Sequence, residues 1–89
     1  MVIDLSVSGG MIWAGVFAGV SKFTGKTDRP LCYVHFETND GKFVLLADKR
    51  LWDAYYKDLK IGDSVIFEMS AVKRDDETIY VFERILMVM

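Results

Sequence analysis

The stretch that most constrains the fold is LCYVHFETNDGKFVLLA, residues 31–47, which predicts a tight β-hairpin. In its first arm, Cys32, Val34 and Phe36 recur at every second position, the period of a strand with one buried face. The opposite face then carries Leu31, Tyr33, His35 and Glu37. The tetrapeptide TNDG at 38–41 suits a turn, because Asn, Asp and Gly tolerate positive φ. We therefore expect residues 42–47 to return antiparallel, and the rest of the chain to close a barrel around this hairpin.

Length and composition indicate one globular domain spanning residues 1–89. Hydrophobic residues make up 52% of the chain and charged residues 27%, a globular rather than a disordered profile with enough apolar residues for one core. No apolar run reaches the roughly 18 to 20 residues that span a bilayer, so we expect no membrane association. Asp4 stands where a signal peptide carries lysines, and Cys32 is the single cysteine. We therefore expect a cytoplasmic protein, in a bacterial host cell if it is viral.

The N-terminal part predicts two strand segments joined at Gly9 and Gly10, where glycine permits a bend. Residues 2–7 alternate apolar and polar side chains, and residues 11–23 alternate small apolar residues with larger ones. The small-residue face, which runs from Ile12 to Val20, suits the crowded wall of a curved barrel. This assignment places Trp13 and Phe17 on the outer face.

The second half predicts a helix followed by two strands. Asp48 is a plausible N-cap, and Leu51, Tyr55 and Leu59 recur at four-residue spacing, which indicates about three helical turns before Gly62. We expect the aromatic residues of this helix to plug the barrel. Residues 65–71 and 79–88 then form the last two strands. The charged run at 73–77 is expected to be a solvated hairpin tip.

The order strand, strand, strand, helix, strand, strand, with a long and bent first strand, is that of an OB-fold. This fold is a five-stranded Greek-key barrel whose strand 2–3 face and flanking loops commonly bind oligonucleotides. An SH3-like barrel is the alternative. The amphipathic helix between the third and fourth strands favours the OB-fold, so we expect an all-β domain with one short helix.

Several short runs resemble the single-stranded-DNA-binding protein of filamentous bacteriophages. They are GVSK at 19–22, GK at 25–26, LCYV at 31–34 and ERI at 83–85, and the chain length is similar as well. The resemblance implies an OB-type barrel that dimerises and coats single strands during replication. It also implies that Lys22 contacts DNA and that Tyr33 stacks on bases. Two features depart from the family. The segment directly after Lys26 lacks the aromatic residue that the family has there. The loop at 73–77 is acidic and lacks the phenylalanine that the family uses in this loop.

The residues themselves also favour single-stranded nucleic acid as the partner. The net charge is −2, but Lys22, Lys26 and Arg29 make residues 11–30 locally basic. Aromatic side chains beside such a basic track can stack on bases of any sequence. The candidate binding residues are Lys22, Lys26, Arg29, Tyr33, Trp13, Phe17 and His35. For Trp13 and Phe17, burial in the interface of a homodimer is an equally open interpretation.

Catalysis finds little support in the sequence. One histidine and one cysteine fall short of a zinc site, and Gly9-Gly10 lacks the residues of a phosphate-binding loop. We therefore expect no enzymatic activity, no metal and no cofactor. Two functions remain: binding of single-stranded DNA or RNA by a homodimer in a replication context, or a small β-barrel used for protein–protein assembly.

Overall fold

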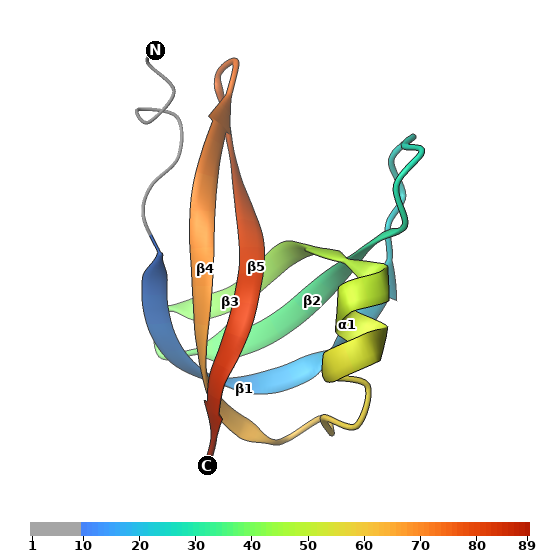
Figure 1. Cartoon of the computed structure of the whole chain (residues 1–89). Helices are drawn as coiled ribbons and strands as arrows, with labels where there is room; N and C mark the ends of the chain where they lie inside the picture. The colour runs from blue at the N-terminus through green and yellow to red at the C-terminus, as the bar shows by residue number, and fades with distance from the viewer. Residues whose placement is uncertain (1–9) are drawn as a thin grey trace.

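The structure, a computed structural model, describes residues 10–89. Its elements in chain order are β1 (Met11–Lys22), β2 (Leu31–Thr38), β3 (Gly41–Asp48), α1 (Lys49–Tyr55), β4 (Ser64–Arg74) and β5 (Glu77–Val88) (Figure 1). The expected strand at 2–7 and Gly9 lie outside the described residues. From residue 10 onward, the element order is the one that the sequence predicts.

The five strands close into a barrel in the order β1-β2-β3-β5-β4. The long β1 pairs antiparallel with both β2 and β4: residues 16–22 pair with β2 and residues 11–16 pair with β4. The barrel closes where β3 and β5 run parallel, with Leu46 opposite Val81. This arrangement confirms the expected five-stranded, OB-like barrel with one short helix.

The β2–β3 hairpin has the predicted register and turn. Its pairs run from Leu31 opposite Asp48 to Thr38 opposite Gly41. The Thr38 hydroxyl accepts a hydrogen bond from the Asp40 N–H at 3.1 Å and donates one to the Gly41 carbonyl at 3.0 Å. Gly41 has φ of +116°, a conformation that glycine adopts without a steric penalty. Cys32, Val34 and Phe36 are buried inside the barrel, as their alternation predicts.

The predicted faces of β1 are reversed, and Trp13 and Phe17 point inward. Phe17 is opposite the fully buried Phe36 and is itself 4% exposed, while Trp13 is opposite the fully buried Phe67. The physical reason is volume, because a small barrel is filled by its inward side chains and aromatic rings supply most of that filling. Phe36 stacks on Phe67 at 4.1 Å between ring centroids, at the centre of this core. The small residues of β1 face outward instead.

A β-bulge in β1 changes which residues face inward. The pairing with β2 shifts between Phe17 and Gly19, and Gly19 has φ of +120°. Before the bulge, odd-numbered residues such as Phe17 face the core. After it, Val20 is opposite Val34 and Lys22 is opposite Cys32, so even-numbered residues take the inward side. Lys22 therefore lies at the end of the barrel and not on the outer face that carries Tyr33.

Helix α1 is shorter than predicted, and its buried stripe is displaced by one residue. Asp48 is the N-cap, as predicted, and its Oδ1 accepts hydrogen bonds from the N–H groups of Arg50 and Leu51. However, Leu51 and Tyr55 are exposed, whereas Trp52 is buried and stacks on Phe17 at 5.5 Å. Tryptophan buries more apolar area than leucine, so its position decides the rotation of the helix. An aromatic residue of α1 does plug the barrel, as expected.

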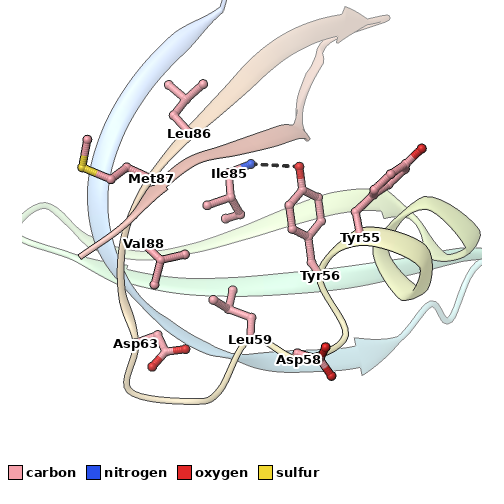
Figure 2. A pocket seen from close by; sticks show the side chains of 9 residues that line it. All are labelled: Tyr55, Tyr56, Asp58, Leu59, Asp63, Ile85, Leu86, Met87 and Val88. Atoms are coloured by element: carbon pink, nitrogen blue, oxygen red, sulfur yellow. Dashed lines mark hydrogen bonds between the residues drawn. The ribbon is translucent and has the colours of Figure 1, made fainter.

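Beyond α1, Tyr56 and Leu59 pack against the core from a turn instead of a third helical turn. The Tyr56 hydroxyl accepts a hydrogen bond from the Ile85 N–H at 3.3 Å, which ties this turn to β5 (Figure 2). In β4, Val65, Phe67 and Met69 are buried as predicted, and residues 73–77 are exposed at the hairpin tip. No helix within residues 10–89 has the length and apolar character required to cross a membrane.

Candidate nucleic-acid interface

A groove of about 500 Å³ crosses the outer face of β2 and β3. One side is the β1–β2 loop, residues 23–30, and the other is the start of β5 at the β4–β5 hairpin. Figure 1 shows that this loop and this hairpin rise on the same side of the barrel, with β2 and β3 passing between them. We call this cavity the aromatic groove. It occupies the position that OB-folds commonly use for oligonucleotides.

Three aromatic side chains line the aromatic groove: Phe23 from the loop, Tyr33 from β2 and Tyr80 from β5. Phe23 and Tyr33 are in contact, with ring centroids 5.4 Å apart at an interplanar angle of 48°. Tyr33 is partly exposed and lies beside Leu46 on the outer face, while Tyr80 is 44% exposed. The rings are therefore held by neighbouring side chains and remain accessible to a planar ligand.

The charged residues of the groove are Lys26, Arg74 and Glu77, which gives a formal charge of +1. Lys26 comes from the β1–β2 loop, and Arg74 and Glu77 face each other across the end of the β4–β5 hairpin. A groove with three rings, two cations and one carboxylate suits a ligand that combines planar groups with negative charge.

A second cavity, of about 560 Å³, lies on the other side of the β1–β2 loop. Lys22, Arg29 and Lys49 line it, and no acidic residue among residues 10–89 does, so we call it the cationic pocket. The bulge at Gly19 places Lys22 here, beside Cys32. A hydrogen bond from the Lys49 N–H to the Pro30 carbonyl, 2.8 Å long, joins the start of α1 to the end of the loop. Phe23, Thr27 and Leu31 line both cavities.

The predicted site residues thus divide between two cavities. Lys26 and Tyr33 lie in the aromatic groove, and Lys22 and Arg29 lie in the cationic pocket. His35 is on the outer face of β2, as predicted, and its Nε2 is 2.7 Å from the Ser21 hydroxyl oxygen. It lines a smaller depression with Glu37 and Lys42, apart from the aromatic groove.

Trp13 and Phe17 do not form the outer platform that the alternation predicts. Phe17 belongs to the core, where a base has no access. Trp13 packs edge-on against Phe43 at 4.9 Å between ring centroids, in a depression of about 360 Å³ at the end of the barrel. Val44 and Tyr80 line both this depression and the aromatic groove. Trp13 therefore adjoins the groove from the inside of the barrel.

The cavity drawn in Figure 2 has the opposite electrostatic character. Tyr55, Tyr56 and apolar residues of β5 surround it, and its charged lining residues are Asp58 and Asp63. A polyanion is repelled from such a cavity. By its lining residues, the cationic pocket is the most positively charged of these cavities, with three cations, while the aromatic groove and the depression beside Trp13, which Lys42 lines, each have a formal charge of +1.

Four aromatic or basic residues that line the two cavities are absent from the sequence-based prediction: Phe23, Lys49, Arg74 and Tyr80. Phe23 and Tyr80 have a recognisable signal, because each is an aromatic residue next to a loop that OB-folds use for binding. Arg74 belongs to the run at 73–77, which has more acidic than basic residues and therefore does not suggest a binding site for an anion. Lys49 has no local signal, because its place in the pocket depends on how α1 packs against the β1–β2 loop.

Burial raises the pKa of the Cys32 thiol, and the Asp53 carboxylate raises the pKa of Lys49, whose Nζ lies 2.6 Å from Asp53 Oδ2. Within residues 10–89, no group of three or more His, Cys, Asp or Glu side chains is placed to hold a metal ion. Comparison with protein-family models, curated proteins and solved structures finds no match for this chain.

Proposed function

We propose that this protein binds single-stranded nucleic acid, DNA or RNA, with little dependence on sequence. The observation that carries the proposal is the aromatic groove, which combines Phe23, Tyr33 and Tyr80 with Lys26 and Arg74. Stacking of a base on an aromatic ring contributes about 1 to 3 kcal/mol and tolerates any base. The resemblance of residues 19–34 to the filamentous-phage protein adds a replication context to the proposal.

The distribution of charge supports this proposal more than the net charge does. Lys22, Lys26 and Arg29 come from one loop and its flanking strand, whereas Asp58 and Asp63 lie in the cavity of Figure 2. A strand approaching from solution is therefore attracted to one side of the barrel. Phosphate attraction of this kind weakens with salt, so the binding is measurable by its salt dependence.

The test is a fluorescence titration against oligo-dT and against a duplex of the same length, at several salt concentrations. If Lys22, Lys26 and Arg29 neutralise about three phosphates, the log–log salt slope is roughly −2 for a single strand. Tyr33→Ala should weaken binding by about 1 to 3 kcal/mol with little change in slope. Lys22→Ala should weaken it and flatten the slope by about 0.7.

Two residues of the same chain provide matched controls. Tyr55→Ala removes a tyrosine that is 73% exposed on α1, outside the aromatic groove, and should leave affinity unchanged. Lys57→Ala removes an exposed lysine outside both cavities and should leave the slope nearly unchanged. Circular dichroism of each variant checks the fold. Absence of oligo-dT binding at low salt, or equal affinity of Tyr33→Ala, Lys22→Ala and the parent chain, contradicts the proposal.

A second candidate function is assembly through protein–protein contact, and the outward side chains of β1 favour it. Ile12, Ala14 and Val16 on β1, Ile66 on β4 and Met87 on β5 form what we call the outer apolar face. Ala14 is opposite Ile66, and Ile66 is opposite Met87, so these residues share one side of the sheet. Apolar faces of this kind mark contacts between chains. We infer that a second copy of the chain covers this face, which gives the homodimer that the resemblance implies.

A further inference from the structure

We propose that the cationic pocket is a phosphate site, in which Lys49 acts with Arg29 and Lys22 on the phosphate groups of a bound strand. The inference rests on the proposed function and extends it, because it assigns a separate cavity and a residue of α1 to the phosphate. The aromatic groove then holds bases, and the cationic pocket on the other side of the β1–β2 loop holds the phosphate.

The lining of the cationic pocket is positively charged. Within the described part of the chain, three cations and no acid line a cavity of about 560 Å³, a size within the usual range for small-ligand pockets. Neither Lys22 nor Arg29 forms an ion pair with another residue in the range 10–89. Like charges that converge on one cavity repel one another, and of the three cations only Lys49 has an ion-pair partner within residues 10–89, so the pocket favours an anionic ligand.

The acidic residues near the pocket leave its cations available to a ligand. Asp48 turns its carboxylate into the helix as the N-cap, where it accepts hydrogen bonds from Arg50 and Leu51. Asp28 is exposed on the loop and does not line the pocket. Asp53 pairs with Lys49, but both side chains are more than half exposed, so this ion pair is weak and a phosphate can compete for the lysine.

The cationic pocket adjoins the aromatic groove. Phe23, Thr27 and Leu31 line both cavities, so the loop is a thin partition between them. A base that stacks on Phe23 in the groove has its own phosphate near this partition. Arginine suits the phosphate because its planar fork presents several donors, and lysine adds a point charge.

The first experiment uses inorganic phosphate alone and follows backbone amide shifts in the full chain. Phosphate should shift the amides of Lys22, Arg29 and Lys49 more than those of Tyr33 and Tyr80. The double variant Arg29→Gln/Lys49→Gln should abolish the shifts that remain at Lys22, whereas the control Lys57→Gln should preserve all of them. Shifts spread evenly over surface lysines, or unchanged in the double variant, overturn the phosphate site.

The second experiment titrates oligo-dT. Lys49→Gln should weaken binding about two- to fivefold at low salt, the strength of an exposed ion pair, and flatten the log–log slope by roughly 0.7. Asp53→Asn should strengthen binding about twofold, because it frees Lys49. Asp58→Asn removes the same charge in the cavity of Figure 2 and should change affinity less than Asp53→Asn does.

Two sources of phosphate are compared with strands of equal length. A 5′-phosphorylated strand that binds more tightly than the unphosphorylated one, with the difference lost in Lys49→Gln, identifies a terminal phosphate. Equal affinities that fall together in Lys49→Gln identify a phosphodiester within the strand. Both outcomes support the phosphate site.

The outcomes also separate this inference from the proposed function. Normal oligo-dT binding with no effect of the double variant on affinity or slope overturns the phosphate site and leaves the function standing. Absence of oligo-dT binding with specific phosphate shifts at Lys22, Arg29 and Lys49 supports the site and contradicts the function.

Discussion

Individual residues in this barrel take their roles from the strand face on which they lie. Tyr33 and Phe36 are three positions apart on β2, and one lies in the aromatic groove while the other is fully buried. Phe17 shows what alternation cannot predict. A two-residue period separates the two faces of a strand, but it does not say which face points into the barrel. In β1 both faces are apolar, so side-chain volume decides the matter.

Cys32 tests the assignment of faces on β2. It is 2% exposed and burial raises its thiol pKa, so at a given pH a smaller fraction of the thiol is ionised in the folded chain than in the unfolded chain. A neutral maleimide should therefore react slowly with the native protein and fast after denaturant is added. Fast stoichiometric labelling of the native chain would show that the faces of β2 are reversed, and that Tyr33 points inward.

At the scale of elements, the sequence predicts most of what local signals control. The hairpin at 31–47, the N-cap at Asp48 and the buried face of β4 all follow from turn chemistry and alternation. The β1 faces and the rotation of α1 do not follow from them, because they depend on how aromatic volume fills one shared core. For the same reason, the sequence predicts several residues of the candidate site but not how they divide between two cavities. Lys26 and Tyr33 share a groove, while the bulge at Gly19 moves Lys22 into another cavity.

The bulge is itself testable through Gly19. Its φ of +120° is strained for any residue with a Cβ, and an added Cβ meets Ile61 at 3.4 Å, which is ordinary contact. Gly19→Ala should therefore lower the free energy of unfolding by about 1 to 3 kcal/mol through backbone strain. Urea denaturation measures this loss.

Gly41→Ala is the matched control, because Gly41 has a similar φ of +116° and open space around it. It should cost a similar amount of stability without altering the cationic pocket. Gly19→Ala should in addition reduce the contribution of Lys22 to the salt slope for oligo-dT. Equal slopes for the two variants would show that the bulge does not position Lys22.

The molecule as a whole has surfaces of different character on different sides. Cations line the pocket beside the β1–β2 loop, acids line the cavity of Figure 2, and apolar side chains cover the outside of β1 and β4. The ion pair between Arg84 and Glu68, 2.7 Å long, lies at one margin of the outer apolar face. Binding of a strand and self-association therefore need not compete for the same surface.

The protein should self-associate through the outer apolar face. Ile12 is 64% exposed and Met87 is 55% exposed, so the outer apolar face presents large side chains to water. Covering them with the same face of a second copy removes that area from water, which is the main driving force for association. Sedimentation at micromolar concentration should give about twice the chain mass of 10.2 kDa.

Ile12→Asp should shift the protein to monomer, because a dimer would bury an unpaired carboxylate. Leu51→Asp makes the same change at an exposed position on α1 and should leave the dimer intact. A parent chain that sediments as a monomer, or a dimer that persists in Ile12→Asp, would remove the outer apolar face as the interface and with it the support for the assembly function.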